Sequence, residues 1–268
     1  MLAAAFMFVL VPVLIIGAFL FAAWREGRNS PYVFGIGHVI SNSFSAIGGA
    51  PVALLAASLL INAPISLVPQ MLQNGRESPW YWLTALGLSW FLIYPYITLF
   101  MTSLAINALA GRQADLADAF RVARQRYLSG IALFVLVGIG LTAGFLLLVI
   151  PGLVLFLTWF VVWPVLANEE QGVFDCFIRS GELMNGMRWR LLLLMVIAAI
   201  LYGVFGGMSG ALSLALGGED GSPIAMAIDT VTGTLTGLIQ TTAAAAVYHE
   251  ARTAKEGMGS HDLEAVFA

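Results

Sequence analysis

The chain has 268 residues, of which 60% are hydrophobic and only 10% are charged. Soluble domains carry roughly a quarter charged residues, so this composition excludes a surface that faces water all round. The net charge of -3 argues against a nucleic-acid partner, and the single Cys176 excludes both an intramolecular disulfide and a multi-cysteine metal site.

Long apolar runs without charges predict membrane-spanning helices. A span needs about 20 mostly apolar residues, and its backbone groups must be paired internally, which favours helices for continuous runs. We predict an all-α, polytopic transmembrane helix bundle of about seven spans, at residues 2–24, 51–72, 80–108, 130–149, 152–168, 190–216 and 224–248.

The first span stands apart from the other six in this scheme. Residues 1–24 lack the basic start and the small-residue cleavage site of a secretory signal, so we interpret them as an N-terminal transmembrane anchor. We expect residues 32–250 to form a six-span membrane domain and residues 251–268 to form a cytoplasmic tail.

The basic residues lie in alternate loops. Eleven of the twelve follow the first, third, fifth and seventh spans, and only Arg76 lies in the other loops. Because Lys and Arg concentrate on the cytoplasmic side, this distribution predicts an outside N-terminus and a cytoplasmic C-terminus. The orientation of the later six spans is the same if the first span is left out.

Ile150-Pro151-Gly152 divides an apolar stretch, 130–168, that is too long for one ordinary span. Proline cannot continue a helix interior and glycine tolerates a turn, so a tight hairpin on the outer side is the simplest interpretation. A pair of re-entrant half-helices is the alternative.

Three cytoplasmic segments are amphipathic, and each directly precedes a pair of spans. The apolar faces consist of Ile36, Ile40, Phe44 and Ile47 in 33–48, of Leu116, Phe120, Ala123 and Tyr127 in 115–128, and of Phe174, Phe177, Ile178 and Gly181 in 172–187. Such helices lie in the membrane interface with the apolar face among acyl chains. The recurring unit of one interfacial helix and two spans indicates a threefold internal repeat, and the ordinary amphipathicity of short loops is the alternative.

Several segments resemble a known family. They are Ile150-Pro151-Gly152, the span ending Trp163-Pro164-Val165-Leu166-Ala167-Asn168-Glu169, Arg179-Ser180, Gly186-Met187-Arg188-Trp189-Arg190 and, more weakly, Phe34–Ser41 and Val247–Arg252. Together they resemble the glycerophosphoryl diester phosphodiesterase membrane-domain family over about 33–255. The resemblance implies a polytopic protein of the bacterial inner membrane. It implies no hydrolase activity, because that activity belongs to a soluble domain for which these residues leave no room. Gly181 departs from the pattern, where an aromatic residue is expected.

Asp229 is the one ionisable residue that we place within a predicted span. A charge at mid-bilayer costs at least about 2.5 kcal/mol, so such residues often mark a functional path. Thr232, Thr236 and Gln240 follow it at helical spacing, and the four residues form a candidate transport path. Helix packing through the threonine hydroxyls, or a cap on the outer end of the helix, would also explain them.

The cytoplasmic arginines are candidates for binding anionic lipid headgroups, at about 1 kcal/mol each. The best placed are Arg121, Arg124, Arg126, Arg188 and Arg190. Control of membrane topology is the alternative for each. Glycines spaced four apart, at Gly140/Gly144, Gly203/Gly207, Gly206/Gly210 and Gly233/Gly237, predict close helix packing.

The sequence contains no recognisable catalytic or metal-binding constellation. His38, His249 and His261 are far apart, and we interpret Glu169-Glu170 as a solvated turn at a span end. We therefore expect no catalytic residues, metal or cofactor.

These observations predict a non-enzymatic integral membrane protein. We expect it to organise lipid or membrane shape, or to serve as a membrane partner subunit. Its expected partners are anionic membrane lipids and either another protein or a second copy of the chain. A small-solute or lipid transporter with a polar path along 224–248 is the alternative, and an intramembrane enzyme is the least favoured class.

Overall fold

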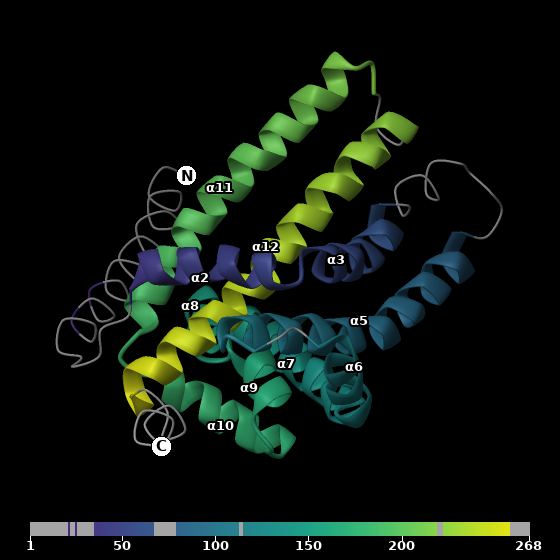
Figure 1. Ribbon diagram of the computed structural model, residues 1–268. Helices are drawn as coiled ribbons and strands as arrows, with labels where there is room; N and C mark the ends of the chain where they lie inside the picture. The colour runs from purple at the N-terminus through teal and green to yellow at the C-terminus, as the bar shows by residue number, and fades with distance from the viewer. Residues whose placement is uncertain are drawn as a thin grey trace.

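The computed structural model describes residues 35–66, 79–112, 115–218 and 222–257, together with Phe21 and Arg25. Within them the regular structure is entirely helical (Figure 1). The helices are α2 (Ile36–Gly49), α3 (Pro51–Ser66), α5 (Pro79–Leu109), α6 (Leu116–Gln125), α7 (Tyr127–Leu147), α8 (Val149–Thr158), α9 (Val162–Asn168), α10 (Val173–Met184), α11 (Arg188–Ala215) and α12 (Pro223–Glu256). The predicted all-α class is confirmed for this part of the chain, whereas the predicted anchor at 1–24 lies outside it, except for Phe21.

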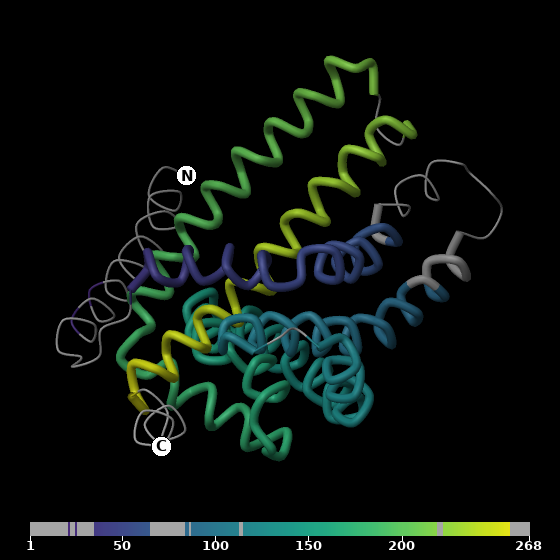
Figure 2. The backbone as a smooth tube through the Cα atoms, in the orientation of Figure 1, coloured from purple at the N-terminus to yellow at the C-terminus, as the bar shows by residue number. Residues whose placement is uncertain are grey.

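Helix contacts recur through the chain in three units: α2–α3–α5, α6–α7–α8/α9 and α10–α11–α12. Within each unit the two long helices contact each other as a hairpin. Each short helix packs on the last helix of another unit: α6 on α5, α10 on α9 and α2 on α12. The first long helices do the same, because α7 contacts α5, α11 contacts α8 and α3 contacts α12. The contacts between units therefore form a closed cycle, in which the last unit returns to the first. Figure 2 shows α12 passing beside α2.

The last helices of the three units, α5, α9 and α12, meet in the centre of the molecule. Residues 97–106 of α5, 164–167 of α9 and 245–248 of α12 are all buried, so these stretches are covered on every side. A helix that is buried all round belongs to the core. The core therefore lies toward the ends of α5, α9 and α12, close to the short helices.

Away from this core the α11–α12 hairpin extends beyond its neighbours (Figure 1). Residues 199–208 of α11 are exposed in sequence without interruption, including Leu201 at 58% and Phe205 at 52%. Surfaces that face water rarely expose so many consecutive apolar residues, whereas a helix that contacts lipid is expected to do so.

Four helical stretches of the described residues are long and apolar enough to cross a bilayer: Gly87–Leu109, Tyr127–Leu147, Val149–Asn168 and Arg188–Ala215. A fifth is obtained if α2 and α3, whose axes differ by 98°, count as one broken span. This content is consistent with a membrane protein. The predicted span at 224–248 forms the greater part of α12 but is not among the four. Its charge and its hydroxyl and amide side chains make it too polar.

Two helix breaks follow from local sequence. Leu148 is extended and separates α7 from α8, so the chain reverses directly before Ile150-Pro151-Gly152. Both arms of this hairpin have the length of a full span, which favours the hairpin over the re-entrant alternative. Pro164 has no N–H to continue a helix, and α8 and α9 are separated at residues 159–161. The Ser180 hydroxyl donates to the Thr158 carbonyl oxygen at this break (2.7 Å).

The three short helices fall within or close to the predicted segments 33–48, 115–128 and 172–187. Their middle turns bury mainly small side chains: Val39, Ser43 and Ala46 in α2, Ala119 and Ala123 in α6, and Cys176 and Ser180 in α10. Larger apolar side chains are exposed, including Phe44 (63% exposed), Leu116 (46%) and Phe174 (71%). Each short helix therefore leaves an apolar face that the described chain does not cover.

Candidate functional site

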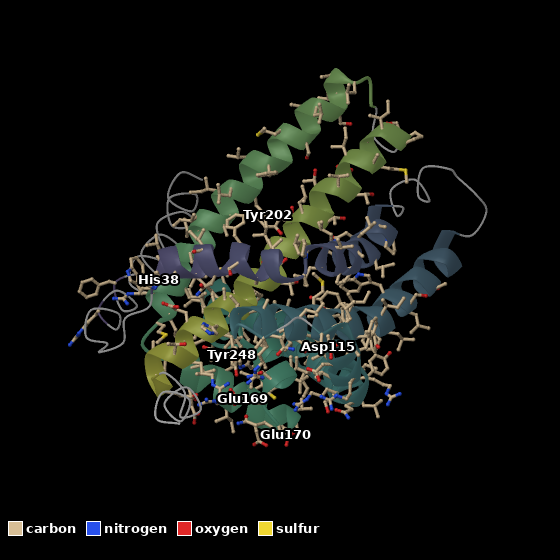
Figure 3. All side chains as sticks on the ribbon, in the orientation of Figure 1. His38, Asp115, Glu169, Glu170, Tyr202 and Tyr248 are labelled. Atoms are coloured by element: carbon tan, nitrogen blue, oxygen red, sulfur yellow. The ribbon has the colours of Figure 1, made fainter. Side chains whose placement is uncertain are left out.

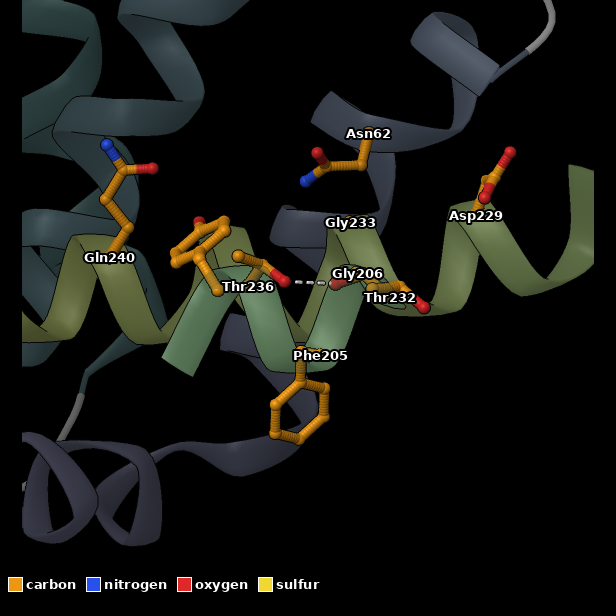
Figure 4. A pocket seen from close by; sticks show the side chains of 10 residues that line it. Asn62, Phe205, Gly206, Asp229, Thr232, Gly233, Thr236 and Gln240 are labelled. Atoms are coloured by element: carbon orange, nitrogen blue, oxygen red, sulfur yellow. Dashed lines mark hydrogen bonds between the residues drawn. The ribbon is translucent and has the colours of Figure 1, made fainter. Parts of the chain in front are cut away.

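A pocket of about 280 Å³ lies between α3, α11 and α12 (Figure 4). The predicted path residues Asp229, Thr232, Thr236 and Gln240 all line it. The structure therefore brings together the four residues that helical spacing had grouped. It adds Asn62 from α3, Tyr202, Phe205 and Gly206 from α11, and Gly233 and Gly237 from α12, none of which we predicted for this site.

Ser58 joins α3 to α12 beside this pocket. Its hydroxyl donates to the Thr234 carbonyl oxygen at 2.7 Å, and Asn62 Nδ2 donates within α3 to the Ser58 carbonyl oxygen at 2.8 Å. A Cβ at Gly237 would lie 2.8 Å from Asn62 Nδ2, and one at Gly233 would lie 3.3 Å from Asn62 Oδ1. Because neither glycine has a side chain, the Asn62 side chain can pack directly against α12.

Asp229 has no hydrogen bond or ion pair to any described residue, and it is exposed at one end of the pocket (Figure 4). It does not cap α12, which was one alternative. The helix begins six residues earlier, at Pro223, and the Ser222 hydroxyl accepts from the Ala225 N–H. The cap is therefore complete without Asp229.

The threonines around the pocket direct their hydroxyl protons into their own helix. Thr230, Thr234 and Thr236 donate to the carbonyl oxygens of Met226, Thr230 and Thr232, respectively. This is the packing role that we weighed as an alternative to a path.

The polar lining ends at Gln240. Beyond it, Thr242, Ala245, Ala246, Val247 and Tyr248 are buried in the core, and the Thr242 hydroxyl is engaged by backbone carbonyl oxygens of its own helix. In this conformation the described residues form a pocket in one half of the molecule, and no path continues along α12 to its other end.

A second polar cluster lies near the other end of α12 and centres on Glu169 (Figure 3). Arg179 Nε donates to Glu169 Oε2 at 3.0 Å, and the Tyr248 hydroxyl donates to Glu169 Oε1 at 2.9 Å. Asn168 Nδ2 donates to the same Tyr248 oxygen at 3.0 Å. The Glu169 side chain is only 13% exposed.

The cluster continues to the end of α12. Arg179 also pairs with Glu256, which accepts from Arg252 Nε at 2.8 Å, and Lys255 donates to the carbonyl oxygen of Glu182. Side chains from α10 and α12 are therefore joined to the turn after α9. We call this set, Glu169, Arg179, Tyr248, Arg252 and Glu256, the charged network.

The interpretation of Glu169-Glu170 as a solvated turn is correct for Glu170 and wrong for Glu169. Glu170 is exposed, whereas Glu169 lies against Tyr248 and Arg179. No signal in the local sequence distinguishes the two acids, because the partners of Glu169 lie 10 and 79 residues further along the chain.

The arginines proposed for lipid headgroups differ in their surroundings. Arg126 Nη1 donates to the carbonyl oxygens of Leu166 and Glu169, so it caps the C-terminal end of α9, where a cation is favourable. Arg121 pairs with Asp118, and Arg124 is exposed. Their binding to lipid stays a prediction.

Arg188 and Arg190 are both half-buried at the start of α11. Arg188 Nε is buried without a hydrogen-bond partner among the described atoms. A buried guanidinium N–H without a partner costs free energy. An added hydrogen-bond acceptor would therefore stabilise Arg188.

Cys176, His38 and His249 lie within the described residues, whereas His261 lies outside them. The Cys176 side chain is fully buried, and burial raises the pKa of its thiol to about 11, so the thiol stays protonated at neutral pH. His38 Nδ1 lies 3.3 Å from Glu250 and joins α2 to α12. Among the described residues no three His, Cys, Asp or Glu side chains are grouped to hold a metal ion.

Comparisons of the chain with protein-family models, with curated proteins and with solved structures found no match.

Proposed function

We propose that the protein is a non-enzymatic integral protein of the bacterial inner membrane that organises lipid in one leaflet through α2, α6 and α10. The observation that carries this proposal is the same arrangement in all three: smaller side chains toward the protein, and Phe44, Leu116 and Phe174 exposed. A short helix with an uncovered apolar side lowers its free energy by entering the acyl boundary.

Chain connectivity supports a common leaflet for the three helices. Each is followed by a hairpin of long helices that returns the chain to the side from which it left. The basic residues follow the same pattern, since α6, α10 and the adjoining helix ends carry Arg112, Arg121, Arg124, Arg126, Arg179, Arg188, Arg190, Arg252 and Lys255. We infer a cytoplasmic position for this end, where anionic lipid meets these cations.

The cyclic contacts of the three units support the threefold internal repeat. A repeat of this kind would place the three short helices around the core at similar depth, so that they act together on lipid packing. Three apolar wedges in one leaflet expand that leaflet relative to the other, which favours curvature.

Reconstitution into liposomes tests the proposal. We expect the protein to change vesicle shape in cryo-electron micrographs, and to do so more strongly in vesicles that contain phosphatidylglycerol. A triple variant, Phe44→Ser, Leu116→Ser and Phe174→Ser, should lose the effect. A control triple variant at exposed positions of the long helices, Leu146→Ser, Leu201→Ser and Leu214→Ser, should keep it. Unaltered vesicles with the wild-type protein would refute the proposal.

A small-solute or lipid transporter is the second candidate. It is favoured by the pocket that Asp229, Thr232, Thr236 and Gln240 share. It requires a second conformation, because the core closes α12 beyond Gln240. If an identified substrate crosses proteoliposomes at the same rate with Asp229→Asn as with the wild type, the pocket has no part in its transport.

A further inference from the structure

We propose that the pocket between α3, α11 and α12 binds an ammonium group. This inference needs only that the chain lies in a bilayer, and it does not rest on the role of the three short helices. Its first support is the charge of the lining: among the described residues, Asp229 is the one ionic side chain there, and no Lys, Arg or His lines the pocket. An anion would meet an uncompensated carboxylate, whereas a cation would neutralise it.

The second support is the hydrogen-bonding capacity of the pocket. Asn62 Nδ2 donates to Ser58, which leaves Asn62 Oδ1 as an acceptor (Figure 4). The Thr236 hydroxyl donates to the Thr232 carbonyl oxygen and adds a second oxygen beside Tyr202. Asp229 adds carboxylate oxygens without a described partner. An ammonium group brings three donors and no acceptor, which is the complement of this set.

The third support is the aromatic wall from α11. Tyr202 and Phe205 line the pocket, and the Tyr202 side chain lies against Thr236. Aromatic faces attract ammonium groups, and the attraction is larger where water is excluded. A carboxylate combined with aromatic rings is a common means of recognising such a cation.

The same inventory argues against a metal ion and against a large ligand. A hard cation such as Ca²⁺ takes six to eight oxygen ligands, commonly with several carboxylates, and the part of the chain that the structure describes offers this pocket one carboxylate. A volume of about 280 Å³ is at the lower limit for pockets that bind small molecules. A headgroup-sized amine is the size of ligand that fits.

The surroundings indicate how such a ligand arrives. Exposed apolar side chains flank the pocket on both helices, including Leu201 and Val204 on α11 and Leu235 and Ile239 on α12. The pocket therefore opens among side chains suited to acyl chains. The ammonium group could belong to a lipid such as phosphatidylethanolamine or to a free amine, and the two sources can be separated by experiment.

The full-length protein is purified after equilibration in mixed phosphatidylethanolamine and phosphatidylglycerol bilayers, and the retained lipid is quantified by mass spectrometry. In parallel, soluble glycerophosphoethanolamine and ethanolamine are titrated by calorimetry. We expect Asp229→Asn to weaken retention or binding by at least about tenfold, because the variant loses a hydrogen bond to a charged group. Thr236→Val should reduce it less, and Glu170→Gln, a carboxylate outside the pocket, should leave it unchanged.

Retention of phosphatidylethanolamine that depends on Asp229, without binding of the soluble amines, would identify a lipid as the source. Binding of soluble ethanolamine that depends on Asp229 would identify a free amine. Equal retention by the wild type and both pocket variants, or an Asp229 effect that is the same for phosphatidylglycerol, would overturn the assignment. Should Asp229→Asn fail to fold, Thr236→Val and Asn62→Leu provide the same comparison. Vesicle shape is not measured in these assays, so their failure leaves the lipid-organising proposal intact, and the reverse also holds.

Discussion

The two halves of α12 differ sharply although they belong to one continuous helix. Residues 223–240 line an open pocket and carry Asp229 without a partner among the described residues. Residues 241–256 enter the core and end in the charged network, where Tyr248 and Glu256 connect α12 to Glu169 and Arg179. The first half carries an ionic side chain without a described partner, whereas Tyr248, Arg252 and Glu256 in the second half are all paired.

This difference separates a region suited to binding from a region suited to stability. Polar groups that are left unpaired cost stability and are retained where a ligand completes them. Polar groups that pair across three elements fix how those elements pack. We therefore expect substitutions in the second half to affect unfolding, and substitutions in the first half to affect binding alone.

The largest effect is expected for Glu169→Gln. The substitution keeps the shape of the side chain but removes the charge that pairs with Arg179, and it weakens the acceptor for Tyr248. Because both partners are largely buried, the free energy of unfolding should fall by about 2 to 3 kcal/mol, below the range for fully buried pairs. Thermal unfolding in detergent measures the change.

Glu170→Gln is the matched control for that variant. The neighbouring carboxylate is exposed, and its loss should change the free energy of unfolding by no more than about 0.5 kcal/mol. Equal effects of the two substitutions would show that the charged network does not stabilise the fold.

The next largest effect is expected for Ala246→Leu. Ala246 is fully buried where α12 enters the core, so a larger side chain must displace its neighbours at a cost of about 1 to 3 kcal/mol. Leu235→Ala, at an exposed position of the first half, is the comparison and should be nearly neutral. A neutral result for Ala246→Leu would mean that the core around the second half is loosely packed.

The sequence permits the prediction of features that lie on a single helix. Asp229, Thr232, Thr236 and Gln240 repeat at steps of three and four residues, so their common face is readable before any neighbour is known. The segments predicted for the three short helices end within three residues of the observed helices, but part of their predicted apolar faces, including Ile47, Ala123 and Phe177, lies against the core.

Features that depend on which helices are neighbours could not be predicted. Asn62 enters the pocket because α3 packs on α12, and Glu169 is covered because Tyr248 comes from a helix 79 residues away. The glycine pattern shows the same limit. A Cβ at Gly144 would lie 3.0 Å from Gly152 Cα, as close packing requires, whereas one at Gly207 would have no described atom within 4 Å. Spacing alone does not say which face of a helix has a neighbour.

A smaller effect, on reactivity and not on stability, is expected at Cys176, which lies buried in α10. Because burial raises the pKa of this thiol from 9.0 to about 11, maleimide labelling of the native protein at neutral pH should be about a hundredfold slower than for a free cysteine. The buried thiol stays mostly protonated even at pH 9, so the labelling rate should increase only as the pH approaches the raised pKa of about 11. The engineered cysteine in Cys176→Ser with Glu170→Cys, at an exposed position, should label at the ordinary rate, and rapid labelling of native Cys176 would contradict its burial.

The smallest effect on stability is expected for Asp229→Asn, the substitution expected to have the largest effect on ligand binding. Asp229 has no described partner to lose and is exposed, so the free energy of unfolding without ligand should change by no more than about 0.5 kcal/mol. Thermal unfolding of the delipidated protein is the measurement. A stabilisation of more than that amount would also be informative, because it would show that the wild-type carboxylate is held at a cost in the absence of a cation. A destabilisation comparable with that of Glu169→Gln would show that the two halves of α12 are not separate in function, and that Asp229 contributes to the fold.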